Sequence, residues 1–361
     1  MKINQSHAVM RHRRTADPVM LREIFAAPAR VEVLLAREME GLNRALARFR
    51  AQRPPLIFVA GRGTSDNAAV FGRYLFEHFV GIPVSGAALS LFTLYPAPMH
   101  LKGALAIGVS QSGESPDVVK AMRAARRAGA FTLVITNTPG SSLTQDADHT
   151  VLLHAHKERA VAATKTYLAE LVAMVMTCQA LGGRDLSDAD LASLPDAIRA
   201  ALNCDAAIRE LAPYFRYAAN AVCLARGFNF PTAREIALKL QETCYLAAEG
   251  MSAADFLHGP IAMLGEMTPL LLFAPAGPTA KFMLDLSRRL RKQGADVIAF
   301  TNHQPIAHAA TMSVYCPVRI REGLSPIPLS ALGQLFACHL AVARGLNPDA
   351  PRRLTKVTRT L

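Results

Sequence analysis

The chain repeats itself at an interval of about 165 residues, and this internal repeat constrains its fold more than any other feature. The apolar run Leu56–Ala60 is followed by Gly-Arg-Gly, and the apolar run Ala221–Ala225 is followed by Arg-Gly. Further along each half, the apolar residues before Asn137 resemble those before Asn302. Two copies of one structural unit are the simplest explanation of these matches.

Within each copy, apolar runs alternate with segments of helical periodicity. Residues 115–129 carry Val118, Val119 and Met122 at helical spacing and end at a glycine, and residues 281–294 follow the same pattern. Such alternation predicts an α/β fold in which parallel strands are joined by helices on both faces of the sheet. Ligands of such sheets bind at the carboxyl ends of the strands, which directs attention to the loops there.

The pattern also suggests where the parts of the chain begin and end. Residues 1–50 are predicted to be a helical segment, which Pro54-Pro55 separates from the first domain. We expect a first domain at 51–200, a second at 201–345 and a tail at 346–361.

Composition narrows the class of protein. The best candidate for a membrane helix, Leu171–Met176, is far shorter than the roughly 20 apolar residues required. The six cysteines are scattered and show no spacing typical of zinc. We therefore predict reduced thiols, a cytoplasmic location, no membrane partner and no bound metal.

The net charge of +12 allows three interpretations. The chain shows no helix-turn-helix or RNP-like signature and few aromatic residues, so no nucleic-acid partner is predicted. Attraction of an anionic metabolite and a solvated basic surface without a role both remain open. The basic residues gather near both ends of the chain, at Arg11, Arg13, Arg14, Arg352, Arg353, Lys356 and Arg359.

The loop 110–115 reads Ser-Gln-Ser-Gly-Glu-Ser between a predicted strand and a predicted helix. Hydroxyl groups and free backbone N–H groups at a helix start suit a phosphate. An ordinary helix cap at Ser115, with Pro116 in the first turn, is the alternative. That alternative does not account for Ser110 and Ser112.

Candidate acid–base groups lie in the second copy. Glu235, Lys239 and Glu242 share one face of a predicted helix, although an ordinary surface ion pair would have the same spacing. His258 precedes Gly-Pro in a tight turn, where it is either structural or a general acid or base. Lys356 in the tail could pair with a phosphate or attack a sugar carbonyl.

Together these motifs resemble the sugar isomerase (SIS) domain family, and more closely the isomerase half of glutamine–fructose-6-phosphate aminotransferase. The resemblance extends from about residue 50 to nearly the end of the chain, without the glutaminase half. The motifs that carry it follow the family's order and are Gly63-Thr64-Ser65, the loop 110–115, Asn137–Leu143, Ala163-Thr164-Lys165, Arg226-Gly227, Ala237–Glu242, His258-Gly259-Pro260 and Pro351–Lys356.

The resemblance implies two tandem SIS domains, each a parallel sheet flanked by helices in a flavodoxin-like three-layer arrangement. It also implies that Glu242 moves a proton between C1 and C2 of an open-chain sugar, helped by Lys239 and supported by Glu235. His258, donated by a neighbouring subunit, would open the sugar ring, and Lys356 would reach the sugar carbonyl. The phosphate and the sugar hydroxyls would be held by Gly63, Thr64, Ser65, Ser110, Gln111, Ser112, Ser115 and Ala163, the last standing where the family often has serine.

The implied activity is that of a glucosamine-6-phosphate deaminase that releases fructose 6-phosphate and ammonia, acts as a homodimer and needs no cofactor. Hexose-phosphate isomerisation and deglycation of a fructosyl-amino-acid phosphate are alternatives in the same class. A phosphosugar sensor without catalysis is the alternative from another class. The predicted small-molecule partner is a hexose or hexosamine 6-phosphate.

Overall fold

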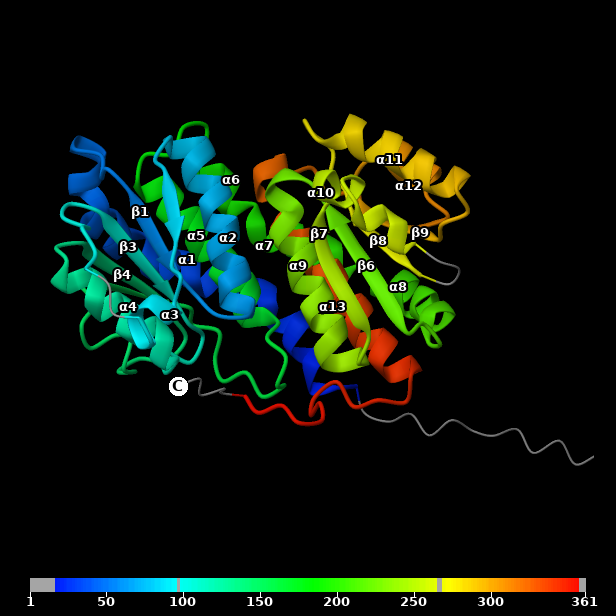
Figure 1. Ribbon diagram of the computed structural model, residues 1–361, viewed down its shortest axis with the longest axis horizontal. Coiled ribbons are helices and arrows are strands. Elements are labelled where there is room, and N and C mark those ends of the chain that lie inside the picture. Colours follow the sequence, from blue (N-terminus) through cyan, green and yellow to red (C-terminus); the bar gives the residue numbers. More distant parts are fainter. Residues whose placement is uncertain (1–16, 96–97, 265–267, 357–361) are drawn as a thin grey trace, which may run out of the picture.

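The computed structural model describes residues 17–95, 98–264 and 268–356, which form two parallel five-stranded sheets. Figure 1 shows the sheets side by side, each with helices packed around it. The strand order is β2-β1-β3-β4-β5 in the first sheet and β10-β9-β8-β6-β7 in the second. The strands are β1 Ile57–Ala60, β2 Val84–Gly86, β3 Leu105–Val109, β4 Phe131–Thr136, β5 His149–Leu152, β6 Asn220–Ala225, β7 Ala247–Ser252, β8 Leu270–Phe273, β9 Val297–Thr301 and β10 Met312–Tyr315.

The two orders are the same when β6 is set against β1, β7 against β2 and so on, which confirms the predicted repeat. Each order is that of a flavodoxin-like sheet, in which the switch point lies between the first and third strands. The pairing is parallel throughout, with Val59 beside Ile107 in the first sheet and Leu224 beside Leu272 in the second. The predicted α/β class is therefore correct.

Helices surround both sheets and connect their strands. The longest, α1 (Val19–Ala51), lies in the predicted N-terminal helical segment, whose residues 1–16 fall outside the described residues. The α-helices that follow are α2 Thr64–Leu75, α3 Ser90–Thr93, α4 Pro116–Arg127, α5 Lys165–Ala180, α6 Asp188–Ala192, α7 Leu194–Leu202, α8 Asp205–Leu211, α9 Phe230–Lys239, α10 Ala253–Leu257, α11 Ala280–Lys292, α12 Gln304–Ala309 and α13 Pro326–Ala343. The shorter helical turns are η1 Phe76–Val80, η2 Ala212–Phe215, η3 Gly227–Asn229, η4 Leu240–Cys244, η5 Pro260–Met263 and η6 Glu322–Leu324.

One apolar cluster occupies the centre of the molecule, between the two sheets. It joins strand residues such as Ile107 and Phe273 to the helices α1, α5 and α13. A separate cluster covers the outer face of each sheet, under α4 in the first copy and under α11 in the second. Each sheet therefore has helices on both faces, and the central helices are shared by the two copies.

The helix α13 is apolar enough by length and composition to cross a membrane, but 89% of that window is buried inside the protein. A helix that is apolar all round is expected at the centre of a large core. The strongest apolar candidate is thus Pro326–Ala343 and not Leu171–Met176, which lies in α5 and is fully buried. Both segments are core helices of the described chain.

The tail returns from the second copy to the first, as the lower edge of Figure 1 shows. After α13, the Asp349 carboxylate accepts hydrogen bonds from the backbone N–H groups of Val19 and Met20, at 2.8 and 2.7 Å. The backbone N–H of Val161 donates to the Asp349 carbonyl at 3.2 Å. These contacts bring residues 349–356 to the strand ends of the first sheet, whereas residues 357–361 of the predicted tail lie outside the described residues.

Candidate functional site

A cavity of about 360 Å³ lies at the carboxyl ends of β1 and β3 in the first copy. The loop after β1, the loop after β3, the segment before α5, the turn η4 of the second copy and the tail all contribute to it. The lining residues are Arg62, Gly63, Thr64, Ser65, Val109, Ser110, Gln111, Ser112, Ser115, Val161, Ala163, Glu170, Glu242, Leu354, Thr355 and Lys356. All eight residues predicted to bind the phosphosugar therefore lie on one cavity, together with Glu242 and Lys356.

The loop after β3 is held in a tight, preformed conformation. Gly113 has a φ of +67°, and its backbone N–H donates to both the carbonyl and the hydroxyl of Ser110, at 3.1 and 3.2 Å. A Cβ on Gly113 would lie only 2.0 Å from the Ser141 hydroxyl, so only glycine fits. Glu114 is turned away from the cavity, where its carboxylate accepts from the Ser142 N–H and hydroxyl.

Ser115 is the N-cap of α4, but its hydroxyl makes no capping bond. The sequence allowed an ordinary cap here, and the structure instead has Ser115 on the cavity wall. The N-terminus of α4 supplies backbone N–H groups and a partial positive charge at the same point. Arg62 also lines the cavity and forms an ion pair of 2.7 Å with the buried Asp117 in the first turn of α4. This wall is suited to an anion.

The opposite wall carries the acid–base group of the second copy. Glu235 and Lys239 lie on α9 with no exposed side-chain surface, whereas the Glu242 side chain is 23% exposed on η4 and reaches the cavity. The Lys239 ammonium lies 3.2 Å from Glu235 and 2.5 Å from Glu242. The three predicted residues are thus in contact, but only Glu242 can touch a ligand.

The sequence predicts one regular helix over Glu235, Lys239 and Glu242, but the structure departs from it after Lys239. After Lys239 the backbone widens into the π-helical turn η4, which contains Glu242. Such turns are rare in proteins and occur often at functional sites, because the extra residue reorients the side chains that follow. The turn η4 therefore positions Glu242 in the wall of the cavity.

The two copies are joined by polar contacts beneath the cavity. Thr64 donates to Glu235 at 3.1 Å and accepts from Lys239 at 3.1 Å, and Asn67 donates to Glu235 at 2.8 Å. Burial raises the pKa of Glu235 to about 6, against the opposing effect of Lys239 and Asn67. Burial disfavours the charge of Lys239, but the Glu235 and Glu242 carboxylates together raise its pKa.

The tail closes one side of the cavity through a buried ion pair. The Lys356 ammonium donates to Glu158 at 2.8 Å and to the carbonyls of Ala160 and Val161, at 2.8 and 3.4 Å. Glu158 is fully buried and also accepts from Thr164 and Thr166. Burial alone would raise the pKa of Glu158, but Lys356 and these hydrogen bonds lower it. Lys356 must leave these partners to reach a sugar carbonyl.

His258 is not among the residues that line the cavity of its own chain. It follows α10, and its side chain is exposed to solvent on the second copy. Within a single chain, His258 therefore cannot open the ring of a sugar bound in this cavity. A second chain would have to bring this histidine to the cavity.

Two carboxylates near the cavity were not singled out from the sequence. Glu158 stands between Lys157 and Arg159, where it reads as a surface charge, and yet it is buried. Glu170 lines the cavity from α5, and its side chain is 1% exposed. The sequence does contain a signal for Glu170, which is the only charged residue between Tyr167 and Cys178. Because burying a charged side chain is costly, a carboxylate in such an apolar run is a candidate functional residue.

The equivalent place in the second copy is filled by the chain itself. Glu322 is buried, and its carboxylate accepts from the Thr279 N–H at 3.0 Å and the Thr279 hydroxyl at 2.9 Å, at the start of α11. A Cβ on Gly277 would lie 2.4 Å from that carboxylate. An internal carboxylate thus takes the position that an anion could occupy, whereas the corresponding loop of the first copy borders the cavity of about 360 Å³.

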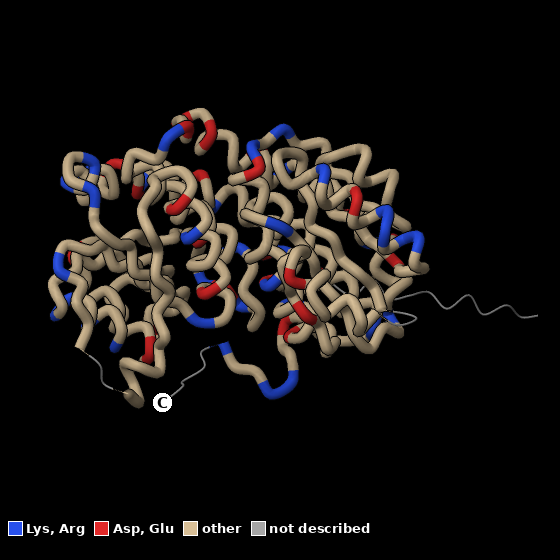
Figure 2. The backbone as a smooth tube through the Cα atoms, turned by 45° about the horizontal axis from the view of Figure 1, so that its top comes forward, with Lys and Arg blue, Asp and Glu red and all other residues tan. Residues whose placement is uncertain are grey.

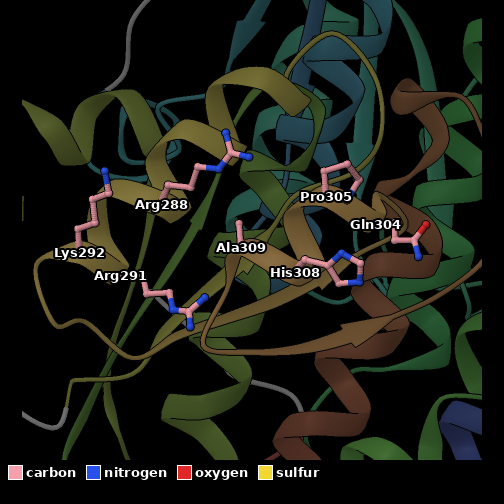
Figure 3. Close-up of a pocket in the computed structure, with 7 residues that line it drawn as sticks. All are labelled: Arg288, Arg291, Lys292, Gln304, Pro305, His308 and Ala309. Carbon is pink, nitrogen blue, oxygen red and sulfur yellow. The ribbon is translucent and has the colours of Figure 1, made fainter.

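A larger hollow, of about 830 Å³, lies on the surface of the second copy between α11 and α12. Figure 3 shows Arg288, Arg291 and Lys292 on one side of it and His308 on the other. It is open to solvent, and the described residues that line it include His308 and three cationic side chains but no carboxylate. Lys and Arg residues are also scattered over both halves of the tube in Figure 2, without forming one continuous stripe. Arg11, Arg13, Arg14 and Arg359 lie outside the described residues.

Among residues 17–95, 98–264 and 268–356, no group of three His, Cys, Asp or Glu side chains is arranged to hold a metal ion. The six cysteines are free thiols, and all but Cys204 are buried. The described residues that line or support the cavity offer carboxylates, hydroxyls and two lysines, Lys239 and Lys356.

Comparisons with known proteins identify the family to which this chain belongs. The profile of the SIS domain matches residues 52–180 and 214–344, one match for each copy. The chain is 34% identical over 93% of its length to a glutamine–fructose-6-phosphate aminotransferase (isomerizing) of Pyrococcus horikoshii, and spans 57% of that relative. A crystal structure described as a phosphosugar isomerase from Silicibacter pomeroyi is 32% identical, with a TM-score of 0.82 over 92% of this chain and 100% of that one.

A glucosamine-6-phosphate deaminase from Thermotoga maritima shares the fold, with a TM-score of 0.77 at 19% identity over 95% of this chain and 100% of that one. The class is thus an α/β protein of two tandem sugar-isomerase-type units. The chain belongs to the SIS domain family. Within that family it is homologous to the isomerase half of the aminotransferases, and it spans little more than half the length of the curated relatives it matches.

Proposed function

We propose that this protein is a glucosamine-6-phosphate deaminase of the SIS type, which converts glucosamine 6-phosphate to fructose 6-phosphate and ammonia. The observation that carries the proposal is the cavity that the hydroxyl-rich loop 110–115 of the first copy and Glu242 of the second line together. The similarity to phosphosugar enzymes of the same family supports the substrate class. Similar folds host different reactions, so the site has to carry the specific activity.

In the proposed reaction the phosphate lies against the loop 110–115 and the start of α4, and the sugar extends toward Glu242. His258 of a second chain opens the ring. Glu242 removes the proton from C2 and returns it to C1, so that the aldose amine becomes a ketose imine. Water adds to the imine carbon, and the C–N bond breaks to leave the ketone and ammonia.

Each neighbouring group has a proposed part in this transfer. Lys239 holds the Glu242 carboxylate by its 2.5 Å hydrogen bond, and Glu235 fixes Lys239 from behind. Ser65, Gln111 and the other hydroxyl groups of the wall bind the phosphate and the sugar hydroxyls. Lys356 closes the cavity over the ligand and would exclude water from the proton transfer. We also propose a cytoplasmic homodimer that needs no cofactor.

Ammonia release from glucosamine 6-phosphate by the purified protein tests the proposal. We expect steady ammonia production with stoichiometric fructose 6-phosphate, and no ammonia from glucosamine, which lacks the phosphate. A panel of glucose 6-phosphate, fructose 6-phosphate and a fructosyl-amino-acid 6-phosphate separates simple isomerisation and deglycation from deamination. Turnover of another member of the panel without ammonia from glucosamine 6-phosphate would replace the proposed substrate, and binding without any turnover would indicate a sensor.

A further inference from the structure

Glu170 is a buried carboxyl group in the wall of the cavity for which the proposed reaction has no use. It lies in α5, and its Oε1 accepts a hydrogen bond of 2.8 Å from the hydroxyl of Ser65, a predicted ligand-binding residue. Its other oxygen, Oε2, is buried and has no hydrogen-bond partner among the described residues. A buried carboxylate with an unsatisfied oxygen is costly, and the neutral acid is far less so.

The other carboxylates around the cavity each have a cation. Glu242 and Glu235 contact Lys239, Glu158 contacts Lys356, and Asp117 contacts Arg62. Glu170 has no ion pair among the described residues. An ionised Glu170 would therefore add an uncompensated negative charge to a wall that receives an anionic phosphosugar.

Some of the groups around Glu170 raise its pKa and others lower it. The pKa of Glu170 is raised to about 8, chiefly by burial and to a smaller extent by Glu235 on α9 and Glu158 in the loop before α5. The Ser65 hydroxyl and Lys239 oppose this rise. On α1, which packs on α5, Glu23 is paired with Lys165 at 3.3 Å.

We propose that Glu170 is a positioning residue that has to be protonated for a phosphosugar to bind at this cavity. The inference rests on the proposed function, because it takes the ligand to be a phosphosugar. When Glu170 is neutral, either group can donate in the Ser65–Glu170 hydrogen bond, so the Ser65 proton is free to point at an anionic ligand. When Glu170 is ionised, it holds that proton, and Ser65 presents only lone pairs.

The test is the affinity for glucitol 6-phosphate, an open-chain phosphosugar without a carbonyl, which binds without turnover. The phosphate group of this ligand has a second pKa of about 6, so the charge of the ligand is nearly constant from about pH 7 to about pH 9. We expect the wild-type affinity to be constant up to about pH 8 and then to fall toward about tenfold per pH unit. Glu170→Gln, which keeps the shape but cannot ionise, should have a flat profile.

Glu210→Gln is the matched control, since Glu210 is exposed on α8 and should keep the wild-type profile. Calorimetry in two buffers of different ionisation enthalpy gives a second readout. Above the pKa of Glu170, wild-type binding should take up about one proton and Glu170→Gln binding none. The inference would be overturned if the affinity of Glu170→Gln also fell above about pH 8, or if wild-type binding took up no proton.

The same experiment separates this inference from the proposed function. Binding of glucitol 6-phosphate with coincident pH profiles overturns only the role of Glu170. Proton-linked binding without ammonia release from glucosamine 6-phosphate supports the role of Glu170 and overturns the deaminase. A wild-type protein that does not bind the phosphosugar at pH 7 overturns both.

Discussion

At the scale of single residues, the site depends on how each charge is compensated. Lys239 is completely buried between two carboxylates, and only Glu242 of the three reaches the cavity. A buried ion pair is rarely a net source of stability, but the loss of one partner leaves an uncompensated charge. The arrangement is therefore better explained by the positioning of Glu242 than by stability of the fold.

Replacing Glu242 by glutamine should abolish most of the activity while leaving ligand binding intact. The amide keeps the hydrogen bond to Lys239 but cannot accept a proton from C2, so we expect kcat to fall by about 10²–10⁴-fold with little change in KM. Steady-state kinetics with glucosamine 6-phosphate measure both constants. Glu249→Gln, a change of the same kind at an exposed position of β7, should behave like the wild type. Full activity in Glu242→Gln would remove this residue from the mechanism.

At the scale of elements, two local deviations from regular structure make the site. One is the π-helical turn η4, which directs Glu242 into the cavity, and the other is the loop 110–115, which turns at a glycine of positive φ. The first copy has its own π-helical turn, η1, which carries Phe76 and Phe79 in the core. The same backbone feature thus serves packing in one copy and the candidate chemistry in the other.

Gly113→Ala should distort the loop 110–115, which we propose binds the phosphate. The new methyl group would overlap the Ser141 hydroxyl in addition to straining a backbone with φ of +67°, so the loop has to move. We expect the affinity for glucitol 6-phosphate to fall by at least about tenfold, because a misplaced loop loses several hydrogen bonds at once.

Gly140→Ala provides the control for this change. Gly140 has a similar φ of +71°, but a Cβ there meets nothing within 4 Å. Both variants should lose about 1–2 kcal/mol of unfolding free energy from the left-handed backbone. Only Gly113→Ala should lose affinity, and equal affinities in the two variants would show that the loop tolerates the overlap.

At the scale of the whole molecule, the two copies of one unit contribute different residues to one cavity. The first copy has an open cavity at its strand ends, whereas Glu322 fills the corresponding position of the second. The second copy supplies Glu242, and the tail crosses back to contact the first copy through Lys356. His258 remains outside this cavity, so a complete site is expected to need a second chain.

Two inactive variants should complement each other if His258 acts on the neighbouring subunit. In a mixed dimer of His258→Ala and Glu242→Gln, one of the two sites receives both native residues. Random pairing should therefore restore about a quarter of the wild-type activity. Co-expression of the two variants, followed by the ammonia assay, measures this recovery. Activity no higher than that of either variant alone would contradict a shared site.

The sequence by itself determined the repeat, the α/β class and the central strands, because buried parallel strands read as continuous apolar runs. It did not reveal the edge strands β2, β5, β7 and β10, which are partly exposed and carry no such run. The loop 110–115 and the spacing of Glu235, Lys239 and Glu242 pointed to a site because these residues are close together in the chain.

Only the tertiary structure decided which distant residues join that site and how their charges are compensated. Glu170 and Ser65 are 105 positions apart, and Lys356 lies 198 positions from Glu158, so no local pattern could pair them. The pKa of Glu170 depends on burial and on neighbours from other elements, which exist only once the chain is folded. Sequence patterns record local spacing and apolar periodicity, whereas the compensation of charge is a property of packing between distant segments.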